Sequence, residues 1–233
     1  MSIGLRIYTK FDRPDPAIID RLKDIPVANL DDNMGRLYAV DAGIKPIGKC
    51  QICGPAFTVK SPGGDNLMFH KALDMAQEGD VIVVSGIGLN DRAFSGDLMA
   101  ELALARKLGG FVIDGYVRDL EGHQAIDFPV YARGIQPNGP YKNGPGEINV
   151  PVALGGQVVM PGDIIVGDAD GLVVIPVRDA EEVCAAGEKM VESEEGYRRD
   201  YRTGTVGPRK WVADKLADLQ VEVLEEKSYG GAR

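Results

Sequence analysis

Short apolar runs alternate with amphipathic segments through the first half of the chain. Val81 to Ser85 and Phe111 to Ile113 are almost wholly apolar, as strands buried on both faces require. A further strand is predicted over about Ala56 to Lys60, because β-branched and aromatic side chains gather there after a glycine and a proline. These runs predict a parallel sheet that is covered on both faces.

The segments between the apolar runs have helical periodicity. Asp65 to Ala76 predicts a helix that is capped by its first aspartate. A second helix is predicted from Leu98 to Leu108, with Leu98, Leu102 and Ala105 on its inner face. The regular alternation of strand and helix indicates an α/β protein.

The two ends of the chain differ from this pattern. Pro16 to Lys23 predicts a short helix, and the polar stretch from Asp31 to Gly35 predicts a turn or the start of a helical turn. Asp127 to Pro176 holds short β runs among glycine, proline and asparagine turns. Arg178 to Glu195 and part of Pro208 to Leu224 then predict two amphipathic helices.

The composition is that of a globular protein, with 44% hydrophobic and 26% charged residues in a chain of 233. No linker-like stretch divides the chain. We therefore expect one domain over residues 1–233, with a core over about 27–176 and a C-terminal helical extension over about 178–226.

The charge restricts the choice of partners. A net charge of -9 and a pI near 4.8 oppose binding to phosphate backbones and anionic lipids, so we expect no nucleic-acid and no membrane partner. The apolar runs are far shorter than the ~20 residues of a membrane span, and Met1 to Lys10 lacks the core of a signal peptide. We expect a cytoplasmic protein.

Cys50, Cys53 and Cys184 are the three cysteines. An odd number gives no disulfide framework and fits a reducing compartment. The first two have the spacing of half a zinc site or of a redox pair, but zinc needs two further ligands and a redox pair is expected to open a helix. Because a strand is predicted directly after Cys53, we expect small buried apolar side chains instead.

The segment from Asp114 to Asp119 is the main candidate for an active centre, because it follows an apolar strand at the end where α/β sheets place their ligands. The guanidinium of Arg118 can bind a carboxylate through two hydrogen bonds, and Asp119 offers a hard oxygen ligand for a divalent metal. The alternative is a surface ion pair at the start of a helix.

Ser95 to Met99 is a second candidate. The glycine at position 96 lets a ligand approach the backbone, and the amides that open the next helix can bind an anion. Asp97 could hold a metal-bound water. A plain N-cap would have the same sequence.

Other motifs have less support. Gly86 to Asp91 resembles a dinucleotide loop but lacks its third glycine, which excludes a nicotinamide cofactor. His70 and His123 lie on different predicted elements, and lone helical histidines more often serve packing or the surface than catalysis. No nucleophile elbow supports a Ser-His-Asp triad.

Together, three stretches resemble the 4-hydroxy-4-methyl-2-oxoglutarate aldolases and their relatives, the RraA-like regulators of ribonuclease E. The resemblance covers about Val27 to Pro176. The stretches are Ser95 to Leu98, Val112 to Asp119, and Ile148 to Val152 continuing to Pro161-Gly162-Asp163 and Gly167 to Gly171.

The resemblance implies a compact layered α/β/α domain, similar to the swivelling phosphohistidine-domain-like fold. It implies a homotrimer or a dimer of trimers with active sites between subunits. It also implies a class II aldolase, in which Mg²⁺ or Mn²⁺ chelates a small 2-oxo acid substrate and pyruvate is released. Oxaloacetate decarboxylation is implied as a side activity, because it passes through the same enolate.

Residue roles follow by position from the same resemblance. Asp119 would face the metal, Arg118 would bind the substrate and its enolate oxygen, and Asp97 would orient a water that shuttles protons. Gly96, Asp97, Leu98 and Met99 would line the pyruvate moiety. An acidic residue of a neighbouring subunit would complete the site, with Glu192, Glu194 and Glu195 all open.

The same family includes regulators that bind a protein partner without catalysis, so the fold alone does not decide the function. The presence of Arg118, Asp119 and Asp97, together with the long C-terminal segment, favours the enzyme over a regulator of ribonuclease E.

Overall fold

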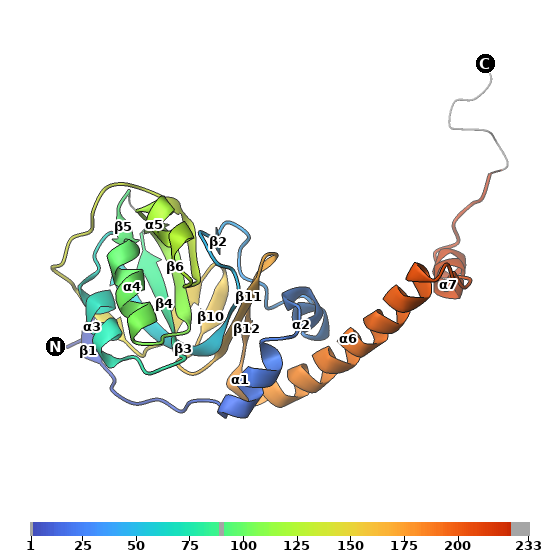
Figure 1. Ribbon diagram of the computed structural model, residues 1–233, viewed down its shortest axis with the longest axis horizontal. Helices are drawn as coiled ribbons and strands as arrows, with labels where there is room; N and C mark the ends of the chain where they lie inside the picture. The colour runs from blue at the N-terminus through green and yellow to red at the C-terminus, as the bar shows by residue number, and fades with distance from the viewer. Residues whose placement is uncertain (1, 89–90, 225–233) are drawn as a thin grey trace, which may run out of the picture. The chain divides into compact units, whose positions relative to one another are not determined.

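The computed structural model, which describes residues 2–88 and 91–224, has a mixed α/β fold (Figure 1). The central sheet has the strand order β1-β8-β3-β4-β6-β7-β2, with β5 paired to β6 and with β11 and β12 joined to it through β3. The strands β9 and β10 form a separate hairpin. The predicted α/β class is therefore confirmed.

The elements have the following bounds. The strands are β1 Leu5–Ile7, β2 Lys45–Pro46, β3 Ile52–Pro62, β4 Val81–Ile87, β5 Ala93–Ser95, β6 Gly110–Val117, β7 Val130–Ile135, β8 Gly146–Ile148, β9 Val152–Leu154, β10 Gln157–Val159, β11 Ile164–Asp168 and β12 Gly171–Ile175. The helices are α1 Pro16–Leu22, α2 Val27–Asn33, α3 Leu67–Met75, α4 Asp97–Ala105, α5 Leu120–Ala125, the 3-10 turn η1 Val177–Asp179, α6 Ala180–Arg202 and α7 Lys210–Asp218.

The parallel strands β3, β4, β6 and β7 form the centre of the sheet. Along β4, Ile82 and Val84 belong to a core cluster with α3 and α4, while Val81 and Val83 belong to a second cluster on the other face with β9 to β12. Consecutive apolar side chains thus serve two cores, which confirms the expectation that these strands are buried on both faces.

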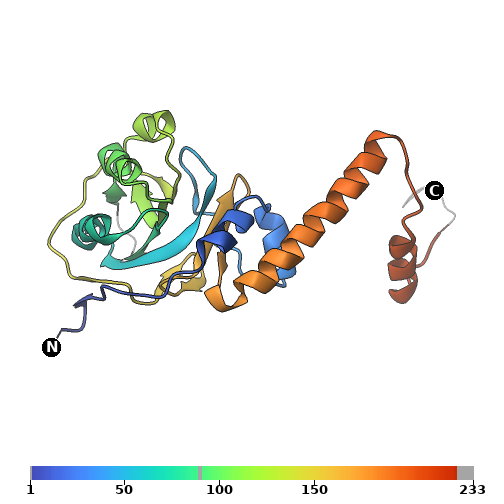
Figure 2. The ribbon, with the colours of Figure 1, turned by 60° about the horizontal axis from the view of Figure 1, so that its bottom comes forward.

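A third core cluster lies between β11–β12 and the helices α1, α2 and the start of α6. Leu22, Leu30 and Cys184 are fully buried there. On its surface Arg21 forms ion pairs with Glu181 at 2.7 Å and with Glu188 at 2.9 Å. Figure 1 and Figure 2 show α3, α4 and α5 on one side of the sheet and α1 and α2 on the other.

The predicted inner face of the second helix is wrong. In α4 the residues against the sheet are Ala100 and Ala103, both fully buried, whereas Leu98 is 76% exposed and Leu102 is 43% exposed. The physical reason is a close approach of the helix to β6, since small side chains meet the sheet and the larger ones turn outward.

Two smaller differences concern element boundaries. The strand predicted at Phe111 to Ile113 continues to Val117 in β6, so Asp114 belongs to a strand and not to a loop. The polar stretch from Asp31 to Gly35 begins as the end of a helix that starts at Val27 and continues as the predicted turn at Met34 and Gly35.

The chain forms two units, Met1–Val191 and Glu192–Arg233. The first holds every strand of the described part and most of α6. The second holds the end of α6 and α7, where Trp211, Leu216 and Leu219 are exposed. Within the described residues no helix is both long and apolar enough to cross a bilayer.

All three cysteines are free thiols. Cys184 is buried, while Cys50 and Cys53 are half-buried, so they are less enclosed than the sequence led us to expect. Burial raises the pKa of the Cys53 thiol to about 12, and its sulfur lies 3.6 Å from the carbonyl oxygen of Ile19. A thiol with that pKa is unreactive at neutral pH, which favours a structural role.

Candidate active site

A recess of about 200 Å³ lies at the carboxyl ends of the parallel strands. The loop before α3, the start of α4 and the β6–α5 turn all meet there. It brings together the six residues that the sequence singled out: Gly96, Asp97, Leu98, Met99, Arg118 and Asp119. A second, more open recess of about 480 Å³ shares Asp97 and Asp119 with the first.

Gly96 gives the Asp119 carboxylate room. A methyl group on Gly96 would overlap Asp119 Oδ2 and would lie 3.3 Å from Arg118 Nε. The backbone of Gly96 is extended, with φ -126 and ψ -177, so the glycine is needed here for space and not for an unusual backbone angle.

Gly122 has the same relation to the other carboxylate. A methyl group on Gly122 would overlap Asp97 Oδ2 and would lie 2.6 Å from Asp97 Cβ. The starts of α4 and α5 therefore pack against each other through two contacts. Asp97 of α4 packs on Gly122 of α5, and Asp119, just before α5, packs on Gly96, just before α4. This arrangement fixes both carboxylates at the edge of the recess.

Asp119 adopts an uncommon backbone conformation. It precedes α5 with φ 63 and ψ 52, and its side chain makes no capping hydrogen bond. A left-handed residue other than glycine costs roughly 1 kcal/mol or more. Its carboxylate pairs instead with Arg118 at the start of α5, which is the surface ion pair that the alternative interpretation expected.

Arg118 is held by its backbone, and most of its guanidinium is unpaired among the residues that the structure describes. Its amide donates to the Ser95 carbonyl at 3.0 Å, and its Nε lies 3.4 Å from Asp119 Oδ2. The two side chains are 45% and 40% exposed, so the pair contributes less than about 1 kcal/mol to stability. The terminal guanidinium nitrogens remain available for an anion.

The amides at the start of α4 are less available than the sequence suggested. The Leu98 amide donates to Asp97 Oδ1 at 2.7 Å, and the Met99 amide donates to the Gly96 carbonyl at 3.2 Å. Anion binding in this recess therefore depends more on its cationic side chains, Arg118 and Lys142, than on these amides.

Three further polar residues line the recess that sequence reasoning did not select: Asn66, His70 and Lys142. Asn66 is 2% exposed and donates from Nδ2 to the Phe94 carbonyl at 2.8 Å, while its Oδ1 has no hydrogen-bond partner in the described part of the chain. Burial, and secondarily Lys142, lower the pKa of His70. Asn66 and His70 could have been predicted from their position, because they follow the carboxyl end of β3 in the sequence.

His123 is fully buried in α5, close to both carboxylates. Neither ring nitrogen has a hydrogen-bond partner among the described residues. Burial lowers the pKa of His123, and the nearby charges of Asp97 and Asp119 and the Arg118 carbonyl oppose that shift. A neutral imidazole therefore lies beneath the site.

Asp114 does not belong to the recess, although the predicted active centre began with it. Its Oδ1 accepts a hydrogen bond from Arg133 Nε, and its Oδ2 accepts one from the Gly155 amide at 2.9 Å. These contacts tie β6 to β7 and to the β9–β10 hairpin. The candidate centre therefore begins at Arg118.

The residues at the recess suit a divalent metal of the Mg²⁺ type. No group of three metal-ligating side chains lies together in the described residues, but Mg²⁺ usually takes one or two carboxylates and completes its shell with water and substrate. Asp119 and Asp97 are two such carboxylates, and the space above Gly96 that a Cβ would fill holds Asp119 Oδ2.

The acidic residues expected from a neighbouring subunit lie in α6. Arg198 on the same helix binds Glu194 at 2.8 Å and Glu195 at 2.6 Å, whereas no ion pair involves Glu192 within the described residues. The supposed dinucleotide loop at Gly86 includes Leu89 and Asn90, which lie outside the described residues.

Comparison with known proteins gives consistent matches. The family model RraA-like (Aldolase/RraA) matches residues 18–174. A protein of Halalkalibacterium halodurans named "Putative 4-hydroxy-4-methyl-2-oxoglutarate aldolase" is 39% identical over 195 residues, which is 83% of this chain and 93% of that protein.

Two solved structures extend the comparison. One is an unusual member of the RNase ES inhibitor RraA protein family from Streptomyces coelicolor, with a TM-score of 0.73, 27% identity and coverage of 81% of this chain and 99% of that one. The other, named S-adenosylmethionine: 2-dimethylmenaquinone methyltransferase, is from Geobacillus kaustophilus, with a TM-score of 0.61, 32% identity and coverage of 65% and 95%.

Proposed function

The chain belongs to the RraA-like family, and on that basis we propose that it is a divalent-metal-dependent aldolase. Its substrate is 4-hydroxy-4-methyl-2-oxoglutarate or a related 4-hydroxy-2-oxo acid, which it cleaves to pyruvate and a second oxo acid. Oxaloacetate decarboxylation accompanies this activity. The observation that carries the proposal is the Arg118–Asp119 pair, which is fixed at the carboxyl end of the sheet yet contributes little to stability.

In this proposal Arg118 binds the 2-oxo acid end of the substrate. Cleavage removes the proton of the 4-hydroxyl group and breaks the bond between C3 and C4, and the electron pair passes to the C2 oxygen as an enolate. A fixed guanidinium stabilises the charge that develops on that oxygen. Protonation of C3 then gives pyruvate.

Asp119, assisted by Asp97 through water, would hold Mg²⁺ or Mn²⁺. The metal supplies Lewis-acid polarisation of the 2-oxo group when it is bound. Asp97 orients a water that carries the proton to and from the substrate, and the contact of its side chain with Gly122 fixes its direction.

Asn66, His70 and Lys142, which the sequence did not single out, suit the part of the substrate beyond its 2-oxo acid end. Lys142 and His70 also line the recess, and we propose that they bind a second carboxylate of the substrate. Asn66 Oδ1, buried and without a partner among the described residues, can accept a hydrogen bond from the substrate hydroxyl.

We further propose that the protein acts as a homotrimer or a dimer of trimers, with one of Glu192, Glu194 and Glu195 of a neighbouring copy at each site. Exposed apolar side chains beside the recess, Leu98 and Leu102, support an apolar contact at this place.

Pyruvate release, coupled to lactate dehydrogenase, tests the role of Arg118. We expect Arg118→Ala to lower kcat/KM for 4-hydroxy-4-methyl-2-oxoglutarate and for oxaloacetate by about 100-fold or more, because one charge-stabilising donor is worth that much. Arg178→Ala is the matched control, since Arg178 also pairs with the next aspartate at 3.3 Å but lies outside the recess. Equal turnover of the Arg118→Ala and wild-type proteins would exclude the assignment.

The metal requirement is tested by chelation. EDTA is expected to abolish pyruvate release, and Mg²⁺ or Mn²⁺ in excess is expected to restore it. Turnover that persists in chelator after dialysis would contradict a class II mechanism.

The second candidate is a non-catalytic regulator of ribonuclease E, which the similarity to the Streptomyces RNase ES inhibitor family favours. It predicts that the purified protein inhibits ribonuclease E in a cleavage assay and turns over neither oxo acid. In that case Arg118→Ala would leave the inhibition unchanged.

A further inference from the structure

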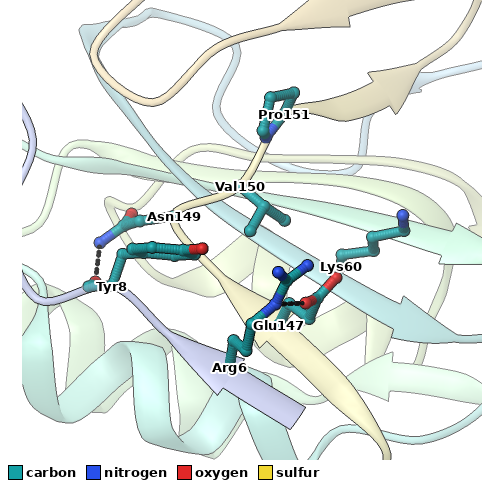
Figure 3. Close-up of a pocket in the computed structure, with 7 residues that line it drawn as sticks. All are labelled: Arg6, Tyr8, Lys60, Glu147, Asn149, Val150 and Pro151. Atoms are coloured by element: carbon teal, nitrogen blue, oxygen red, sulfur yellow. Dashed lines mark hydrogen bonds and ion pairs between the residues drawn. The ribbon is translucent and has the colours of Figure 1, made fainter. Parts of the chain in front are cut away.

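A cavity of about 340 Å³ lies where β1, β8 and β3 meet, and it shares no residue with the recess at Arg118. Figure 3 shows its side chains: charged residues from three strands on one side, Tyr8 on another, and Val150 and Pro151 beyond them. No role in the proposed aldolase reaction accounts for this cavity.

Strand register places the charged side chains in one row. Arg6 lies opposite Glu147, and Glu147 lies opposite Lys60. Residues opposite one another in neighbouring strands point to the same face. Two cations therefore flank one carboxylate, and the row has a net charge of +1.

The Arg6–Glu147 pair leaves donors unused. Arg6 binds Glu147 Oε1 through Nε at 2.5 Å, and the Gly4 amide donates to the same oxygen at 3.3 Å. The hydrogen bond from Arg6 lowers the pKa of Glu147, so the carboxyl group stays ionised at neutral pH. Within the described chain nothing accepts a hydrogen bond from the terminal nitrogens of Arg6, from Lys60 Nζ or from the Tyr8 hydroxyl.

The wall of the cavity is preformed. Asn149 has a left-handed backbone with φ 55, its amide donates to the Thr58 carbonyl at 2.8 Å, and its Nδ2 donates to the Tyr8 carbonyl at 2.8 Å. A strained residue that is tied on both sides holds the chain at Val150 and Pro151 in place. Figure 3 shows the Tyr8 hydroxyl directed toward the Arg6–Glu147 pair.

We propose that this cavity binds a small organic carboxylate. The carboxylate is bound by the free guanidinium nitrogens of Arg6 together with Lys60 and the Tyr8 hydroxyl, and its hydrocarbon part packs on Val150 and Pro151. A planar carboxylate suits the fork of a guanidinium, the net charge of +1 suits a monoanion, and the apolar wall suits carbon. The proposal does not depend on the aldolase assignment.

Fluorine NMR of 4,4,4-trifluorobutyrate measures this binding. The parent protein carries Arg118→Met, so that the recess at the ends of the parallel strands does not compete for the carboxylate. We expect saturable broadening of the fluorine signal. Lys60→Met is expected to weaken the affinity about tenfold, because a charge-assisted hydrogen bond is lost, and Tyr8→Phe is expected to weaken it severalfold. Both changes keep the Arg6–Glu147 pair.

Controls separate the cavity from general charge effects. Lys71→Met removes one exposed lysine from α3 and is expected to leave the affinity unchanged. The uncharged 4,4,4-trifluorobutanol is expected not to bind, and inorganic phosphate is expected to compete more weakly than butyrate. Circular dichroism confirms that each variant is folded.

Three results would overturn the proposal. The first is an absence of saturable broadening in the parent protein. The second is equal affinity in the parent, in Lys60→Met and in Tyr8→Phe. The third is competition by phosphate as strong as that by butyrate, which would remove the role of the apolar wall.

Discussion

Gly96 and Gly122 lie where the carboxylates of Asp119 and Asp97 leave no space for a methyl group. Gly96 immediately precedes α4, and Gly122 lies in the first turn of α5. The position of each carboxylate therefore depends on the start of the other helix. The geometry of the candidate active site is therefore set by four residues together and not by Arg118 alone.

Gly96→Ala tests this dependence. The added methyl group must displace the Asp119 carboxylate, and a displacement of about 1 Å at a reacting group can cost 100-fold in rate. We expect a loss of about that size in kcat/KM for pyruvate release. The fold is expected to persist, since the Gly96 backbone is extended. Gly207→Ala, which adds a methyl group with no atom within 4 Å, is expected to change nothing.

His123 predicts a pH dependence of stability. Burial lowers its pKa in the folded state, so the unfolded chain binds more protons below about pH 6.5, the ordinary value for histidine. The free energy of unfolding is therefore expected to fall as the pH decreases from 7 to 5. In His123→Leu the slope of urea-unfolding free energy against pH is expected to be smaller. His70 retains a contribution of the same sign, and an unaltered slope would exclude His123 as a source.

That these six residues meet in one recess was predictable, because Arg118, Asp119 and the Gly96 segment follow apolar strands and match a family motif. The contribution of Lys142 was not predictable, because no local pattern shows that the loop that holds it meets the start of α3. The direction of the Asp97 carboxylate, which occupies the Leu98 amide, also depends on tertiary contacts with Gly122.

At the scale of elements, α4 shows how packing overrides periodicity. Alanines occupy its buried face and leucines its exposed face, so the usual inference from leucine spacing selected the wrong side. A helix that lies close to a sheet has room for small side chains only.

Ala103→Leu is therefore expected to destabilise the protein by about 1–3 kcal/mol, because it overfills a closed contact. Leu104→Ala, on the exposed side of the same helix and outside the proposed contact at Leu98 and Leu102, is expected to cost less than about 0.5 kcal/mol. Thermal or urea unfolding measures both. A larger loss for Leu104→Ala than for Ala103→Leu would contradict this account of α4 packing.

The strands were the most predictable elements, since β3, β4 and β6 are buried on both faces and their apolar runs reflect that. Their ends were less predictable. β6 continues through Asp114 because Arg133 and the Gly155 amide satisfy that carboxylate, and neither partner is near it in the sequence.

At the scale of the whole molecule, the proposed assembly predicts complementation between two inactive chains. One carries Arg118→Ala, and the other carries glutamine at Glu192, Glu194 and Glu195. When the two are co-expressed in equal amounts, each site that draws on two neighbours is intact in about a quarter of cases. We expect each variant alone to be inactive and the mixture to regain about that fraction of wild-type turnover.

The single-variant preparations, mixed after purification without subunit exchange, are the control for this experiment and are expected to stay inactive. Recovery of no activity on co-expression would contradict a site shared between copies. Light scattering of the same samples reports whether the complex has three or six subunits.

The reciprocal contact between two carboxylates and two glycines also limits how such a sequence can change over generations. A side chain at Gly96 leaves the geometry of the site undisturbed only if Asp119 has first become smaller, and the same order applies to Gly122 and Asp97. A lineage that abandons catalysis can lose the aspartates first and then fill the glycine positions. Regaining the proposed activity would require restoring the glycine first and the aspartate afterwards. A bulky residue at either glycine position therefore indicates a relative in which the activity is not easily restored.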